Sequence, residues 1–259
     1  MARLRKLYVV LFAALFLAAC GGQAGGNEAD LSAKDLFTDM VKANESITSL
    51  RQTIDNDVNV GAGDEEHYEK LDVEQLVDLD AKAMEQHIKQ DSTFEGKTDI
   101  IIYTVGEEGF IYDETLSEWH VITDPGQLAS MVGAVENLDL NEMLDSIIDL
   151  ADQFTVYEES DHYVVRVNEL DDDDMMELLE VMGSEIVELL TVTDEQAQID
   201  DFEYEITVDP ESSLVDEVYF NMSISIDGDD ETLTYQEEQT TEYTDYNEID
   251  EIEIPEEAR

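Results

Sequence analysis

Histidines and carboxylates are the commonest acid–base residue types in active sites, and in this chain neither is arranged as in an active site. His67, His87, His120 and His162 each stand alone, without a second histidine or a cysteine at the spacing of a zinc site. The chain lacks the G-x-S-x-G turn of serine hydrolases, a P-loop and the glycine pattern of dinucleotide-binding domains. Acidic residues are so frequent that a pair at glycosidase spacing would arise by chance. We therefore predict that the protein is not an enzyme and carries no cofactor.

One acidic stretch, DNDVNVGAGDEE, partly fits a calcium-binding loop. Asp55, Asp57, Asn59 and Glu66 occupy positions one, three, five and twelve of an EF-hand loop. Position six should be the glycine of the sharp turn, and here it is Val60. The same alternation also fits the exposed face of a strand. We favour the strand and predict no metal site, which leaves these four residues as weak candidates.

The single cysteine, Cys20, closes a segment typical of exported proteins. A basic start, MARLRK, precedes the apolar run LYVVLFAALFLAA, which is too short for a membrane-spanning helix and has the features of a signal peptide. The small residues of LAAC before the thiol resemble the lipobox of bacterial lipoproteins. That resemblance implies a diacylglyceryl anchor on Cys20, with acyl chains such as palmitate. The alternative is an ordinary secretory signal with an accidental cysteine.

The lipobox divides the chain into three predicted parts. Residues 1–19 are the signal peptide, residues 20–30 are the lipidated cysteine and a glycine-rich flexible tether, and residues 31–259 are a single domain. With Cys20 acylated, no thiol is left for a disulfide, so the domain must be stabilised by its core. We expect the mature protein at the outer face of the cell membrane, lipid-anchored and extracytoplasmic.

The composition is strongly acidic. Asp and Glu number 67 against 12 Lys and Arg, a formal net charge of −55. Nucleic acids and anionic membrane surfaces are excluded as partners because this charge repels them. Salt screens such self-repulsion, so we predict adaptation to saline surroundings. Hydrophobic residues make up 42% of the chain, which is too many for a disordered protein.

The hydrophobic periodicity predicts an α+β fold. Apolar residues recur at helical spacing in 31–50, 124–138, 139–151 and 171–190, and they alternate or cluster as in strands in 70–90, 98–122, 154–170 and 202–246. Ser32 and Asp35 have the spacing of a capping box. Strands that are not interleaved one by one with helices favour an antiparallel sheet with helices on one face.

Aromatic residues gather in the predicted hairpin GFIYDETLSEWHVI. Phe110 and Tyr112 share a face because they are two residues apart, and Trp119 follows the turn. They are either ordinary core or the wall of a cavity between the sheet and its helices, where a nonpolar ligand binds. The predicted cavity combines these three residues with four on the facing helices: Leu128, Met131, Leu144 and Ile148.

The lipobox, the segment SAKDLFTDMVKANESITSLR, this hairpin and the terminal YTDYNEIDEIEIPEEAR resemble uncharacterised lipoproteins of Gram-positive bacteria. These are related in fold to the LolA and LppX/LprG-like lipoproteins. The resemblance implies a curved, incomplete antiparallel barrel with helices covering its concave face and a hydrophobic cavity that accepts acyl chains in some relatives. It implies no catalytic residue.

Two functions fit these observations. The first is a membrane-anchored protein that binds or carries a lipid-like ligand. The second is a non-catalytic envelope or interaction protein whose core is filled and holds no ligand.

Overall fold

The computed structural model describes residues 26–63, 65–94, 96–106, 108–124, 126, 144, 147–168, 170, 172–181, 197–227 and 232–258. Cys20, the signal segment, the tether up to residue 25, Leu128 and Met131 lie outside the described residues. Within the described part, no helix is both long and apolar enough to cross a membrane.

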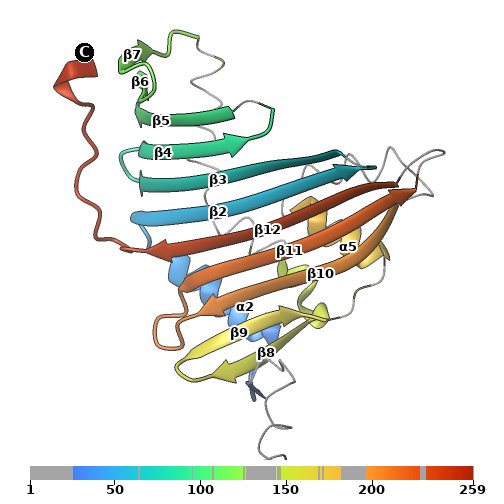
Figure 1. Cartoon of the computed structure of the whole chain (residues 1–259). Coiled ribbons are helices and arrows are strands. Elements are labelled where there is room, and N and C mark those ends of the chain that lie inside the picture. The colour runs from blue at the N-terminus through green and yellow to red at the C-terminus, as the bar shows by residue number, and fades with distance from the viewer. Residues whose placement is uncertain are drawn as a thin grey trace, which may run out of the picture.

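Twelve strands of the described chain form one antiparallel sheet (Figure 1). Their order is β1-β8-β9-β10-β11-β12-β2-β3-β4-β5-β6-β7, with β1 and β7 at opposite edges, so the sheet is not closed into a barrel. The strands are β1 (Asn27–Glu28), β2 (Ser49–Ala62), β3 (Glu65–Asp78), β4 (Ala83–Ser92), β5 (Gly96–Val105), β6 (Glu108–Asp113), β7 (Glu118–Val121), β8 (Phe154–Glu159), β9 (His162–Val167), β10 (Ala197–Val208), β11 (Val215–Asp227) and β12 (Thr232–Thr244).

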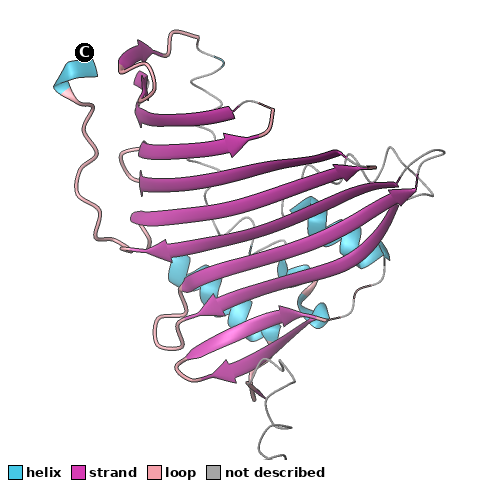
Figure 2. Ribbon diagram, in the orientation of Figure 1, coloured by secondary structure: helices cyan, strands magenta, loops and turns pink. Residues whose placement is uncertain are grey.

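Two α-helices, α2 (Ala33–Asn44) and α5 (Asp172–Val181), lie on the same side of this twisted sheet (Figure 2). Short 3-10 turns span Ala151–Gln153 and Glu256–Ala258. This arrangement confirms the predicted fold class, an α+β protein with an open, curved antiparallel sheet and helices on one face. The predicted helices between residues 124 and 143 lie largely outside the described residues.

Helix α2 begins where the sequence predicts it. The Ser32 hydroxyl oxygen accepts a hydrogen bond from the Asp35 backbone N–H, and the same hydroxyl donates to the Asp35 carboxylate at 2.7 Å. Leu36, Phe37 and Met40 recur at helical spacing and are almost completely buried. The capped start therefore fixes the apolar stripe of α2 against the sheet.

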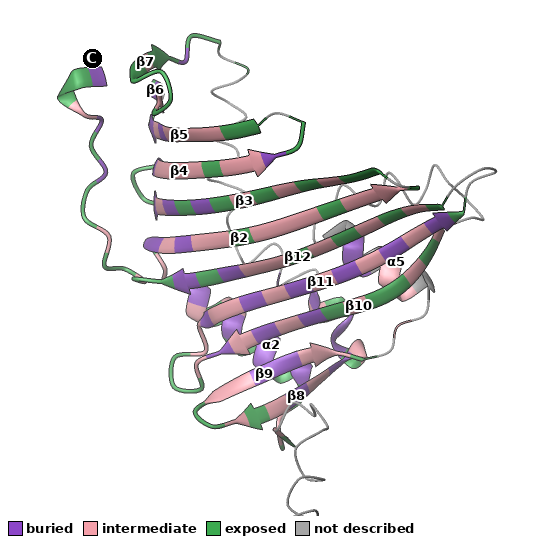
Figure 3. Ribbon diagram, in the orientation of Figure 1, coloured by how far each residue is buried: buried purple, intermediate pink, exposed green. Residues whose placement is uncertain are grey.

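The two faces of the sheet carry different side chains. Phe220, Met222 and Ile224 of β11 belong to one buried cluster with Phe37 and the other core residues of α2, so we call their face the helix face and the opposite one the outer face. Residues that pair across neighbouring strands lie on the same face, and the face changes with each step along a strand. Outside the two register shifts of β10, the strand register therefore assigns each paired strand residue to one face, and burial alternates accordingly (Figure 3).

The main core lies between the helices and strands β8–β11. Phe154, Tyr204 and Phe37 meet there edge to face, with ring centroids 5.4 Å (Phe37–Phe154) and 6.3 Å (Phe154–Tyr204) apart. Leu178 and Leu179 of α5 close the same cluster. This part of the helix face is filled by side chains.

A C-terminal strap, residues 245–258, crosses the outer face. The Asn247 side-chain oxygen accepts hydrogen bonds from the Thr48 backbone N–H and hydroxyl at 2.7 and 3.0 Å, which fixes the start of the strap. Ile254 and Ala258 then pack against Phe110 in a second, smaller cluster. The strap thus covers one end of the strands at the β5–β7 side of the sheet.

Candidate functional site

The helix face continues beyond the main core as a row of aliphatic side chains on β2–β6. The register pairs Ile54 with Val73, Val73 with Ile88 and Ile88 with Ile100, so these four side chains line up across four strands. Ile102 pairs with Ile111 in the adjacent row. We call this set the aliphatic strip: Ile54, Val73, Ile88, Ile100, Ile102 and Ile111.

The aliphatic strip belongs to neither of the two packed clusters in the described part of the chain. Val73 and Ile102 are each 5% exposed, and the other four are half-buried. Five strands at about 4.8 Å spacing give the strip a width of roughly 19 Å, long enough for an acyl chain. It is therefore an apolar surface for which none of the described helices supplies the packing.

A polar row borders the strip. Gln86 Nε2 donates to Gln75 Oε1 at 3.1 Å, Gln75 Nε2 donates to Gln52 Oε1, and Gln52 Nε2 donates to the Tyr243 hydroxyl at 3.3 Å. Gln52 and Gln75 are buried, and burial raises the pKa of Tyr243 to about 12. We call this chain of side chains the glutamine ladder. Its bonds satisfy amides that would otherwise be costly to bury.

The structure corrects the predicted position of the aromatic hairpin. Phe110 and Tyr112 do share a face, and the ring of Trp119 lies tilted against that of Tyr112, with the ring centroids 4.9 Å apart. However, the register places Ile111 rather than Phe110 opposite Ile102 on the helix face. Phe110, Tyr112 and Trp119 therefore lie on the outer face, and the strap covers Phe110.

The predicted partners of these aromatics are elsewhere. Leu144 is completely buried in the main core, and Ile148 packs against that core, on the other side of the sheet. Leu128 and Met131 lie outside the described residues. The predicted cavity between the aromatic hairpin and the helix residues is therefore wrong. The hairpin aromatics lie on the outer face, whereas Leu144 and Ile148 lie on the helix face.

The calcium candidates lie on two paired strands rather than in one loop. Asp55, Asp57 and Asn59 are in β2, and Glu66 is in β3 opposite Gly61. The six residue steps from Asp55 to Gly61 span about 20 Å of strand, so Glu66 cannot share an ion with Asp55. In the part of the chain that the structure describes, no group of three or more His, Cys, Asp or Glu side chains is placed to hold a metal ion.

The outer face of these strands carries charge. Burial, and then repulsion by Asp72, raise the pKa of Asp55. Three of the basic residues on these strands form ion pairs there: Arg51 with Glu74 and Asp245, Lys70 with Asp57, and Lys97 with Asp91. One hollow on this face is lined by Asp57, Asn59, Asp201 and other polar residues, and a second lies under the strap. Neither hollow suits an apolar ligand.

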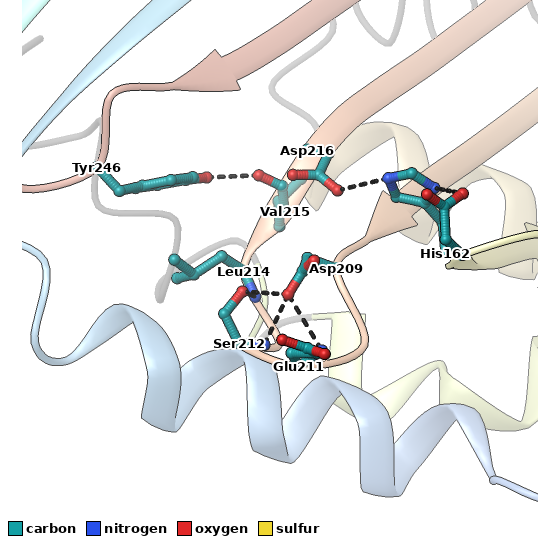
Figure 4. A network of polar contacts seen from close by, with 9 residues as sticks. His162, Asp209, Glu211, Ser212, Leu214, Val215, Asp216 and Tyr246 are labelled. Atoms are coloured by element: carbon teal, nitrogen blue, oxygen red, sulfur yellow. Dashed lines mark hydrogen bonds and ion pairs between the residues drawn. The ribbon is translucent and has the colours of Figure 1, made fainter.

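A polar network at the β10–β11 turn contains a histidine and a serine, and its contacts hold the turn rather than join these two side chains (Figure 4). His162 pairs with Asp216 at 3.3 Å, whereas the Ser212 hydroxyl donates to Asp209 at 2.7 Å. Hydrogen bonds from Ser212 hold the pKa of Asp209 below its usual range. Since the serine is bonded to a carboxylate rather than to the histidine, the network lacks the contact that activates a nucleophile.

The same network fixes the strap. The Tyr246 hydroxyl donates to the Val215 backbone oxygen at 2.6 Å (Figure 4). It ties the strap to β11, beside the turn that Asp209 holds with backbone N–H bonds from Glu211 and Ser212. The network therefore holds the strap and the β10–β11 turn in place.

Comparisons with known proteins identify a family. The model of the "Family of unknown function (DUF6612)" matches residues 32–259. No curated protein matches. Among solved structures, LprF from Mycobacterium bovis is similar with 8% identity and a TM-score of 0.42, covering 88% of this chain and 97% of its own. A DUF1329 family protein from Desulfovibrio piger is similar with 12% identity and a TM-score of 0.24, covering 83% of this chain and 92% of its own.

Proposed function

The chain belongs to the DUF6612 family, whose function is unknown, and from this premise we propose that it is a membrane-anchored, extracytoplasmic lipoprotein that binds an apolar, lipid-like ligand on the aliphatic strip. The observation that supports binding is the strip itself, six aliphatic side chains in register that belong to neither described core cluster. Contiguous apolar surface of this kind marks binding sites in soluble domains.

Charge supports the same proposal. The ion pairs of β2–β5 are on the outer face, while the helix face presents aliphatic side chains and neutral amides, with the acids Glu69, Asp113 and Glu237 around them. A hydrocarbon chain would be favoured on the helix face by about 25 cal/mol for each square ångström removed from water. No group placed for nucleophilic or metal-dependent chemistry adjoins the strip in the described residues, so the proposed role is binding or carriage.

Two neighbouring isoleucines of β5 provide a matched test. Ile100 and Ile101 are both half-buried, but Ile100 pairs with Ile88 on the helix face and Ile101 pairs with His87 on the outer face. Ile100→Glu puts an unpaired carboxylate against the ligand and should weaken lipid binding by at least tenfold. Ile101→Glu should leave it nearly unchanged.

The measurement is native mass spectrometry and lipid extraction of the purified full chain, followed by titration with a fluorescent acyl probe. Co-purified lipid in the wild type and in Ile101→Glu, with loss in Ile100→Glu, supports the proposal. Absence of lipid and of saturable probe binding in all three proteins would leave the alternative, an envelope interaction protein without a ligand site.

The proposed anchor has its own test. Cys20→Ala should move the protein from the membrane fraction to the soluble fraction, because two acyl chains give stable attachment. An unchanged membrane fraction and an unchanged mass would contradict lipidation.

A further inference from the structure

Three consecutive strands repeat one five-residue pattern on the helix face. Leu50-Arg-Gln52-Thr-Ile54, Val73-Glu-Gln75-Leu-Val77 and Met84-Glu-Gln86-His-Ile88 each place a glutamine between two apolar residues. The register aligns the three glutamines with one another. The glutamine ladder is therefore a continuous polar line between two apolar rows, one in the main core and one in the aliphatic strip.

The ladder has a direction. Each carboxamide donates toward Tyr243, so Gln86 stands at the accepting end. Among the described residues, none donates to the Gln86 carbonyl oxygen. A row of aligned amides polarises its members, which makes this terminal oxygen a good acceptor for a hydroxyl or N–H group.

A second polar atom near this end has no partner. Thr104 of β5 is completely buried, and its hydroxyl makes no hydrogen bond. Thr104 pairs with Met84, and Gln86 pairs with Ile102, so Thr104 and Gln86 are diagonal neighbours on the helix face, about 7–8 Å apart. A buried hydroxyl without a partner is uncommon and costly, unless a ligand completes it.

Besides these neutral groups, the helix face carries acids, among them Asp113 opposite Ile100 and Glu69 beside Gln90, and no basic side chain. Arg51, Lys70, Lys89 and Lys97 all fall on the outer face by register. Within the described part of β12 and β2–β6, the helix-face positions hold no Lys or Arg. A phosphate or carboxylate head group buried here would have no cation to neutralise it.

We propose that the site selects neutral lipids that carry a hydroxyl group, with the acyl chain on the aliphatic strip and the hydroxyl between Gln86 and Thr104. The ligand hydroxyl donates to the Gln86 carbonyl oxygen and accepts a hydrogen bond from the Thr104 hydroxyl. This inference rests on the proposed function and adds the chemical class of the ligand. Fatty acid anions and phospholipids are disfavoured.

The test compares three ligands with the same acyl chain, namely oleic acid as its anion, methyl oleate and monooleoylglycerol, on the full-length chain. Monooleoylglycerol should bind about five- to tenfold more tightly than methyl oleate, as expected for the two proposed hydrogen bonds, each of which has a modest net value. The oleate anion should bind more weakly than both.

Two variants remove the proposed partners. Gln86→Leu and Thr104→Val should each reduce the preference for monooleoylglycerol over methyl oleate to about twofold or less. Gln90→Leu, on the same face of β4 and bonded to Glu69, is the matched control and should keep the preference. Thr104→Val should not lower the melting temperature, since it removes a buried hydroxyl that has no partner, and so a loss of preference there would not reflect a loss of fold.

The three-ligand comparison distinguishes a failure of the hydroxyl inference from a failure of the proposed lipid-binding function. If methyl oleate and monooleoylglycerol bind equally well and Ile100→Glu abolishes both, the apolar site stands and the hydroxyl inference is overturned. Tighter binding of the oleate anion than of monooleoylglycerol overturns it as well. If none of the three ligands binds the wild type, the proposed function fails and this inference fails with it.

Discussion

The helix face has two halves that share one sheet but differ in composition. Over β8–β11, aromatic and aliphatic residues such as Phe154, Tyr204 and Phe220 are packed under α2 and α5 and leave no polar row. Over β2–β6, aliphatic rows alternate with the glutamine ladder, and most of the aliphatic strip is only half-buried. The first half therefore supplies most of the stability, and the second supplies a surface with both apolar and hydrogen-bonding character.

Truncation in each half should separate stability from binding. Phe37→Ala removes a completely buried ring from the first half and should cost about 3–5 kcal/mol, or about 10 °C in melting temperature. Ile88→Ala in the strip should cost clearly less because Ile88 is half-buried, yet it should weaken lipid binding several-fold.

Calorimetry and probe titration on both variants check this separation. Phe37→Ala should retain the wild-type lipid affinity at temperatures where it is folded. Equal losses of stability in the two variants, with equal losses of affinity, would show that the halves form one core.

Salt should affect stability and leave neutral-lipid binding nearly unchanged. The outer faces of both halves carry acids, for example Asp55 and Asp72 behind the strip and Glu203 and Glu205 behind the core. Screening of a net charge of −55 should raise the melting temperature by several degrees between dilute buffer and about 1 M sodium chloride. A flat melting temperature in calorimetry contradicts the proposed saline adaptation.

The smallest expected effect comes from one outer-face acid behind the strip. The pKa of Asp55 is raised in the folded protein, so its contribution to stability is present at low pH and is lost as the pH rises through the folded pKa. At neutral pH Asp55 is destabilising, and Asp55→Asn should raise the melting temperature by about 1 °C. The gain should vanish near pH 3, and a gain that persists there would contradict this assignment.

Local signals predict the start of α2 and most of the strands, but the predicted helix over 31–50 is too long, because α2 ends at Asn44 and β2 begins at Ser49. Ser32 and Asp35 mark the helix start, and alternation over residues 98–122 gives β5, β6 and β7. The face of the aromatic hairpin was not predictable, since alternation shows that Phe110 and Tyr112 share a face but not which face. That assignment follows from the register of every pair between β11 and β6.

The glutamine ladder has a signal in the sequence that hydrophobic periodicity alone does not reveal. Gln52, Gln75 and Gln86 each sit at the centre of an apolar-x-Gln-x-apolar pattern. Three such patterns in successive predicted strands indicate a polar row on a buried face. The partner of each glutamine still required the register, which depends on the hairpin turns.

The central claim is that the ligand lies on the helix face of β5. Trp119 cannot report on it because its ring lies on the outer face against Tyr112, so Trp119→Phe serves as the background for a new tryptophan. In Trp119→Phe/Ile100→Trp, titration with monooleoylglycerol should give a saturable blue shift of the emission, and Trp119→Phe/Ile101→Trp should give none. A saturable shift from position 101 with none from position 100 would contradict the account.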